Sequence, residues 1–91
     1  METVMPVRRL SRDEIGQRGV AIYESKLRTI LEPKFHGHFV AIDVETGEYE
    51  VANDASVASD CLWARHPEAQ VLVERIGFPA AFNARRTMQL S

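Results

Sequence analysis

Asp43 and Glu45 are the residues of this chain whose types and spacing point most directly to chemistry. They lie two residues apart at the end of an apolar segment that begins at Phe39. Because successive side chains of a strand point to opposite faces, residues two apart share a face. Two carboxylates on one face can bind the divalent metal ions that clamp the attacking and leaving oxygens in phosphodiester cleavage. The pair is therefore a candidate metal-dependent hydrolase site.

The segment from Phe39 to Gly47 resembles the first motif of the DnaQ-like proofreading exonucleases, in which an apolar strand ends in Asp-x-Glu-Thr followed by glycine. The resemblance implies that Asp43 and Glu45 are metal ligands. That family also needs two later motifs with further aspartates and a His or Tyr base. After residue 54 the remaining acids are Asp60, Glu68 and Glu74. Two carboxylates alone bind Mg²⁺ weakly. We therefore expect an acidic hairpin surface, with no catalytic residue, metal or cofactor.

The histidines and the single cysteine are the other candidates for chemistry. His36 and His38 flank a glycine but lack a convincing third ligand, so we expect a polar loop. Cys61 and His66 are five residues apart on a predicted helix and at its end, so they lie on different sides. We expect Cys61 to be a small core residue. One cysteine also excludes an internal disulfide and a multi-cysteine zinc site.

Arginines near both ends of the chain are candidates for nucleic-acid contact. An antitoxin-like regulatory nucleic-acid binder is therefore the alternative function, although the isoelectric point of about 5.9 lies below the value above 9 that is typical of dedicated binders. The candidate contact residues are Arg8, Arg9, Arg12, Arg85 and Arg86.

The charges are segregated along the chain. Residues 38–60 carry six acids and no base, whereas the segments before and after each carry a net charge of +2. Such an acidic region could steer contact with a basic surface, including the ends of a second copy. No apolar run approaches the roughly 20 residues that cross a bilayer, and the N-terminus lacks a secretory apolar region. We expect no membrane contact and a cytoplasmic location.

Local signals predict the order helix, hairpin, helix, strand. A capping box at Ser11 and Glu14 begins a helix over 12–32, which Pro33 ends. Gly47 supplies the turn of a hairpin between 39–44 and 49–51. Asn53 and Asp54 cap a helix over 55–65, and a third strand covers 70–76. The fold class is α+β, with a small three-stranded sheet covered by helices and its strand order open. We expect a flexible arm at 1–10, one domain at 11–82 and a frayed tail at 83–91.

The predicted first helix carries an apolar stripe that is a candidate partner interface. A chain of this length buries only about 60–65% of its unfolded surface, so self-association is a natural way to cover the remaining apolar area. We expect a non-catalytic interaction or assembly module, a homo-oligomer in which this stripe packs against a partner. The stripe consists of Ile22, Tyr23, Leu27, Ile30 and Leu31.

A second pattern of residues runs from Gly37 to Phe82, which is about half of the chain. Its matching residues are Gly37, Phe39, Val40, Ala41, Ile42, Asp43, Arg65, Pro67, Arg75, Ile76, Gly77, Pro79, Ala80 and Ala81. This pattern is similar to a family of short bacterial proteins of unknown function, with a Gly-x-Phe-Val-Ala-Ile-Asp strand and an Arg-Ile-Gly-x-Pro-Ala ending. The resemblance implies a gene often found beside that of a retropepsin-like protease, and hence a partner protein encoded nearby. It assigns no catalytic residue.

Overall fold

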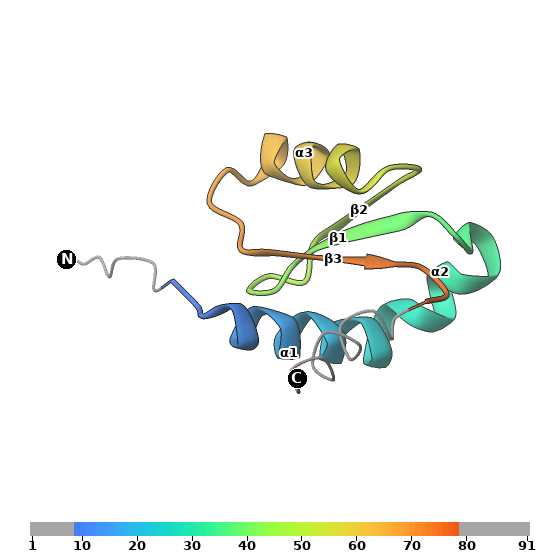
Figure 1. Cartoon of the computed structure of the whole chain (residues 1–91), viewed down its shortest axis with the longest axis horizontal. Coiled ribbons are helices and arrows are strands. Elements are labelled where there is room, and N and C mark those ends of the chain that lie inside the picture. Colours follow the sequence, from blue (N-terminus) through green and yellow to red (C-terminus); the bar gives the residue numbers. More distant parts are fainter. Residues whose placement is uncertain (1–8, 79–91) are drawn as a thin grey trace, which may run out of the picture.

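Three layers make up the part of the chain that the computed structural model describes, residues 9–78. A continuous helical segment of α1 (Arg12–Ile22), η1 (Tyr23–Leu27) and α2 (Arg28–Phe35) lies on one side of a sheet. The sheet contains β1 (Phe39–Asp43), β2 (Tyr49–Ala52) and β3 (Val71–Arg75). Helix α3 (Ala55–Arg65) covers the other side (Figure 1). The α+β class and the order of elements predicted from the sequence are confirmed.

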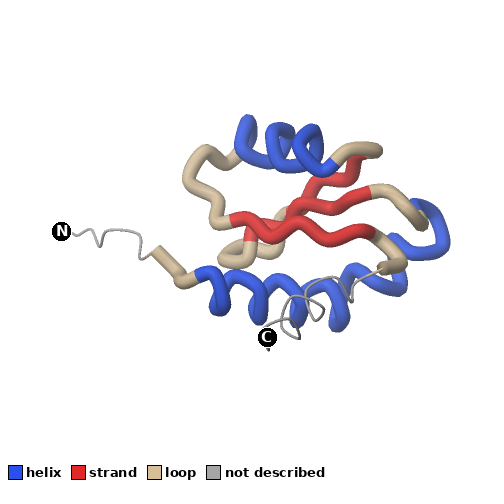
Figure 2. Tube along the Cα trace, in the orientation of Figure 1, coloured by secondary structure: helices blue, strands red, loops and turns tan. Residues whose placement is uncertain are grey.

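The sheet has the strand order β2-β1-β3, and both pairings are antiparallel. The sequence left open whether the third strand pairs with the first or the second, and the structure places it beside β1. The hairpin between β1 and β2 forms as predicted, with Gly47 at a φ of +85° in its turn. Figure 2 shows the three strands side by side in one sheet that lies between the two helical layers. Strands β2 and β3 are therefore the two edges of the sheet.

Successive side chains of each strand point to opposite faces of the sheet, so the apolar residues form two clusters, one on each face. Beneath the long helical segment, the buried residues are Tyr23, Leu27, Leu31, Val40, Ile42 and Ile76. Beneath α3, they are Ala41, Ala58 and Leu62.

Both predicted helix starts are confirmed. The Oγ atom of Ser11 accepts a hydrogen bond from the N–H of Glu14 at 3.1 Å, and the N–H of Ser11 donates to the Glu14 carboxylate at 2.9 Å. The carboxylate of Asp54 accepts the N–H groups of Ser56 and Val57 at the start of α3. Each side chain satisfies helix N–H groups that have no partner within the helix.

The first helical segment differs from the prediction at its end and in its middle. It continues to Phe35 with Pro33 inside α2. Pro33 has no N–H to donate to a carbonyl of the preceding turn, and the helix ends only two residues after it. Its middle is a π-helical turn. Positions four apart drift by about 40° per step around an α-helix. The wider turn counters this drift, so Tyr23, Leu27 and Leu31 all face the sheet.

The described residues include the N-terminal limit of the predicted domain but not its C-terminal limit. Leu10, which the sequence assigns to a flexible arm, is buried, and its N–H donates to the side-chain oxygen of Gln70 at 2.6 Å. The rest of the predicted arm up to residue 8, and the predicted tail at 83–91, lie outside the described residues. No helix within 9–78 is long and apolar enough to cross a membrane.

Candidate functional site

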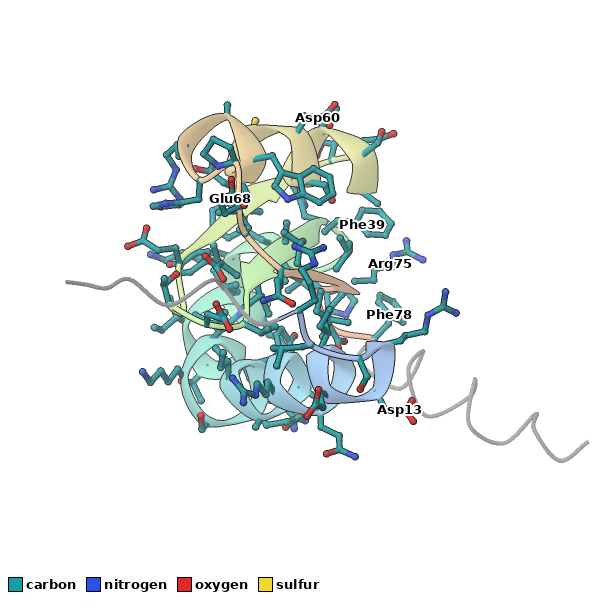
Figure 3. The ribbon with its side chains drawn as sticks, turned by 90° about the vertical axis from the view of Figure 1, so that its left-hand side faces the viewer. Asp13, Phe39, Asp60, Glu68, Arg75 and Phe78 are labelled. Carbon is teal, nitrogen blue, oxygen red and sulfur yellow. The ribbon has the colours of Figure 1, made fainter. Side chains whose placement is uncertain are left out.

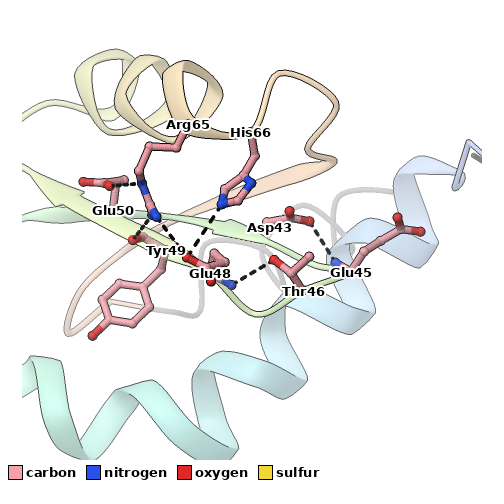
Figure 4. A network of polar contacts seen from close by, with 8 residues as sticks. All are labelled: Asp43, Glu45, Thr46, Glu48, Tyr49, Glu50, Arg65 and His66. Carbon is pink, nitrogen blue, oxygen red and sulfur yellow. Dashed lines mark hydrogen bonds and ion pairs between the residues drawn. The ribbon is translucent and has the colours of Figure 1, made fainter.

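Asp43 and Glu45 shape the hairpin turn. Strand β1 ends at Asp43, so Glu45 lies in the turn and does not share a strand face with it. The buried Asp43 carboxylate accepts the N–H of Glu45 at 3.0 Å (Figure 4). The carbonyl of Asp43 accepts the N–H of Gly47 at 2.8 Å. The Asp43 carboxylate therefore has a structural partner that accounts for its position.

Arg65 binds the acidic hairpin from the last turn of α3. Its guanidinium lies 3.0 Å from the carboxylate of Glu48 and 2.7 Å from that of Glu50, and it donates to the carbonyl of Tyr49 at 3.2 Å (Figure 4). The hydrogen bond from Arg65 lowers the pKa of Glu48 below its usual range. His66 adds a longer contact to Glu48 at 3.7 Å. The acidic surface predicted from the sequence is thus partly neutralised within the chain.

A shallow pocket of about 280 Å³ lies between this turn and the C-terminal end of α3. Its acids either order the turn, as Asp43 does, or are exposed, as Glu45 and Glu68 are. Among residues 9–78, no three His, Cys, Asp or Glu side chains are grouped so that they could hold a metal ion. The pocket is lined by Asp43, Glu45, Thr46, Arg65, His66, Pro67, Glu68 and Ala69.

The other predicted chemical residues are dispersed. The ring of His36 contacts that of Phe78 at 5.0 Å between centroids, and His38 contacts Phe35 at 5.6 Å. The prediction of a buried Cys61 is wrong, because this side chain is exposed. The buried side of α3 carries Ala58, Ser59 and Leu62, and Cys61 lies one residue, or about 100°, around the helix from Leu62.

The prediction of an exposed apolar stripe on the first helix is wrong for three of its five members. Tyr23, Leu27 and Leu31 are buried in the core of the chain itself, because the helical segment lies directly on its own sheet. Ile22 is half-buried against the same core. Only Ile30 remains exposed, at 51%. A partner cannot contact the three buried side chains unless this helix leaves the sheet.

The arginine groups are only partly within the described residues. Arg9 and Arg12 are exposed at the start of α1. Arg8, Arg85 and Arg86 lie outside the described residues. Nucleic-acid binding through these side chains therefore stays a prediction.

Glu74 is a buried acid that the sequence reasoning did not single out. It is 3% exposed, and within residues 9–78 neither oxygen of its carboxylate has a hydrogen-bond partner. Burial raises the pKa of Glu74 to about 7, with a further contribution from the negative charge of Glu24. The alternation of side chains along β3 is the signal that indicates its burial. Leu72, Glu74 and Ile76 share the face of the sheet that meets the long helical segment.

Tyr23 belongs to the apolar cluster beneath the long helical segment, and its hydroxyl connects η1, α2 and the residues that follow β3. Its hydroxyl donates to the carboxylate of Glu32 at 2.8 Å and accepts the N–H of Gly77 at 3.1 Å. Burial raises the pKa of Tyr23 to about 12. The phenol therefore stays neutral and serves as a structural link between the helix and the end of β3.

An exposed cluster of aromatic rings around Arg75 lies at the C-terminal end of β3. The guanidinium of Arg75 lies 4.6 Å from the ring centroid of Phe78 and 5.8 Å from that of Phe39 (Figure 3). Its Nε atom also donates to the carbonyl of Gly37 at 3.3 Å. We call Phe39, Arg75 and Phe78 the Arg75 cluster. Its three side chains come from β1, from β3 and from the residues that follow β3, so only the folded chain brings them together.

Trp63 lies at the opposite end of β3. It is 43% exposed on α3, and its indole N–H donates to the carbonyl of Ala69 at 3.0 Å, just before the strand begins. Exposed aromatic side chains therefore flank both ends of this edge strand.

No protein-family model matches the chain, and no curated protein or solved structure matches it either.

Proposed function

We propose that this chain is a non-catalytic protein–protein interaction module of the bacterial cytoplasm. The observation that carries the proposal is the Arg75 cluster beside the edge strand β3. Aromatic residues and arginine are enriched at protein interfaces and dominate their binding energy. Phe78 is 46% exposed, and its ring packs on a cation that is itself on the surface. The cluster is therefore a suitable anchor for a partner.

The cluster is also held in place before any partner arrives. Arg75 is fixed by two rings and by a hydrogen bond to the Gly37 carbonyl. Binding then costs less side-chain entropy than it would with a freely rotating arginine. The partner encoded nearby, which the family resemblance implies, and a second copy of the chain are both compatible with this surface.

Affinity capture tests the proposal with three tagged forms of the full chain: wild type, Arg75→Ala/Phe78→Ala and Ile30→Ala. The Ile30→Ala variant is the matched control, because it removes an exposed apolar side chain from α2. Each form is recovered from cells that also produce an untagged copy, and the bound proteins are quantified by mass spectrometry.

We expect a protein that is recovered with the wild type and with Ile30→Ala, and that is lost with the double variant. Equal recovery by all three forms would show that the Arg75 cluster is not the binding surface. If no protein, including the untagged copy, is enriched above a tag-only control, the proposed function is wrong.

A further inference from the structure

The outer side of β3 offers unused backbone hydrogen-bonding groups. The N–H of Ile76 donates to the carbonyl of His38, and the N–H of Val44 donates to that of Gln70. In an antiparallel pair, the residues between such bonded positions direct their N–H and C=O groups to the other side. Val71, Val73 and Arg75 therefore point these groups away from β1. In the described part of the chain, no bond reaches the N–H or C=O of Val71 or Val73 on that side.

The two edge strands, β2 and β3, differ in whether their outward backbone groups already have a partner. On β2, the outward carbonyl of Tyr49 is already bound by Arg65 at 3.2 Å. On β3, residues 71–75 contain no proline or lysine. Their two charged residues are Glu74, which is buried on the side of the long helical segment, and Arg75, whose guanidinium packs on Phe39 and Phe78. The open edge is therefore that of β3.

We propose that β3 pairs with β3 of a second copy of this chain. The two strands run antiparallel about a two-fold axis at Val73, and together the two sheets form one six-stranded sheet. This inference rests on the proposed function, whose partner it names. In this register Val73 lies opposite Val73 of the second copy, and Val71 lies opposite Arg75.

The register satisfies the backbone of both strands. Residues 71, 73 and 75 of each strand point their free groups at the same residues of the other, so the bonds are reciprocal. The carbonyl of Arg75 already accepts the N–H of Phe78 at 2.9 Å, but a carbonyl oxygen has a second lone pair.

The side chains at the two ends of β3 are also complementary. A two-fold axis perpendicular to the sheet keeps α3 of both copies on the same face and sets the start of one β3 beside the end of the other. Arg75 then approaches Glu68 and Trp63 of the second copy. Residues 71, 73 and 75 share the α3 side of the sheet, Trp63 is on α3, and Glu68 lines the pocket at the C-terminal end of α3. Figure 3 shows Phe39, Arg75 and Phe78 together, with Glu68 apart from them. Opposite charge and a cation–π contact thus favour pairing with a second copy over pairing with an arbitrary strand.

A disulfide trap tests the register directly. Directly opposite residues in an antiparallel pair lie about 5.5 Å apart at Cα, within the range of about 4.4–6.8 Å that a disulfide spans.

The full chain carries Cys61→Ser to remove its exposed cysteine, together with Val73→Cys. The control is Cys61→Ser with Val57→Cys, because Val57 is 49% exposed on α3. We expect mild oxidation to convert Val73→Cys to a covalent dimer of twice 10.3 kDa well before the control. Equal rates for the two variants would overturn the proposal.

Three further variants distinguish a loss of pairing from a loss of folding. Val73→Pro removes an outward N–H and leaves the bonds of residues 72 and 74 to β1, so light scattering should show a monomer with unchanged circular dichroism.

Arg75→Glu should weaken the dimer about tenfold, and Arg75→Glu with Glu68→Arg should restore it. A dimer that survives Val73→Pro, or a charge exchange without rescue, overturns the pairing. A wild-type chain that stays monomeric but captures another protein through the Arg75 cluster overturns the pairing and leaves the proposed function standing.

Discussion

Replacing Glu74 with glutamine is expected to stabilise the fold at neutral pH and to leave it nearly unchanged in acid. Burial raises the pKa of Glu74 to about 7 in the folded chain, whereas the ordinary value is 4.5. Between these pH values the folded state holds a proton that the unfolded state has released. The free energy of unfolding therefore falls as the pH rises through this window.

The size of the effect follows from the difference between the two pKa values. One pKa unit corresponds to about 1.4 kcal/mol, so wild type is expected to lose about 3 kcal/mol of stability between pH 4 and pH 8 through this group. Glutamine has the shape of the protonated acid and cannot ionise. Glu74→Gln should therefore be about 3 kcal/mol more stable than wild type at pH 8, and equally stable near pH 4.

Urea unfolding followed by circular dichroism at a series of pH values measures this difference. Glu45→Gln is the matched control, because Glu45 is exposed in the hairpin turn and its replacement removes the same charge from the surface. A stability difference that does not change with pH would refute the reasoning. A less stable Glu74→Gln at pH 8 would refute it too, because that result requires a donor that stabilises the carboxylate.

Three further contacts, one within the first helix and two between elements, are tested by substitution and urea unfolding. Gly19→Ala should cost about 1–3 kcal/mol, because a Cβ there would overlap Leu72, and Leu72→Ala in the same chain should recover part of the loss. Ser11→Ala should cost about 1 kcal/mol, and Ser11→Asp should keep most of the stability because it still accepts the helix N–H. Tyr23→Phe should cost about 1–2 kcal/mol by leaving the N–H of Gly77 unpaired. A Tyr23→Phe variant as stable as the wild type would show that water replaces the lost hydroxyl.

The elements of this fold could be predicted wherever a signal acts over a few residues. The capping box at Ser11, the positive φ of Gly47 and the side-chain cap of Asp54 each involve partners within four positions in the chain. The predicted end of the first helix is wrong, because the helical segment continues through Pro33 to Phe35, and the local preference of proline does not include the contacts of this segment with the sheet.

The candidate sites were predicted less well, because their character depends on what covers each side chain. The apolar stripe on the first helix was correctly seen as apolar, but the sequence could not show that its own sheet covers Tyr23, Leu27 and Leu31. Cys61 was assigned to the wrong side of α3 for the same reason. The Arg75 cluster could not be found, since Phe39 and Arg75 are far apart in sequence and meet only because β1 and β3 pair.

The sequence by itself determined the local elements of this protein and the acidic character of its hairpin. The tertiary structure alone decided that β3 lies beside β1, which leaves β3 as an open edge and brings Phe39 to Arg75. It alone decided that Glu74 is buried with no hydrogen-bond partner among the residues that the structure describes. The physical reason is that turns and caps satisfy their hydrogen bonds with near neighbours, whereas strand order and burial follow from how distant segments share one small core.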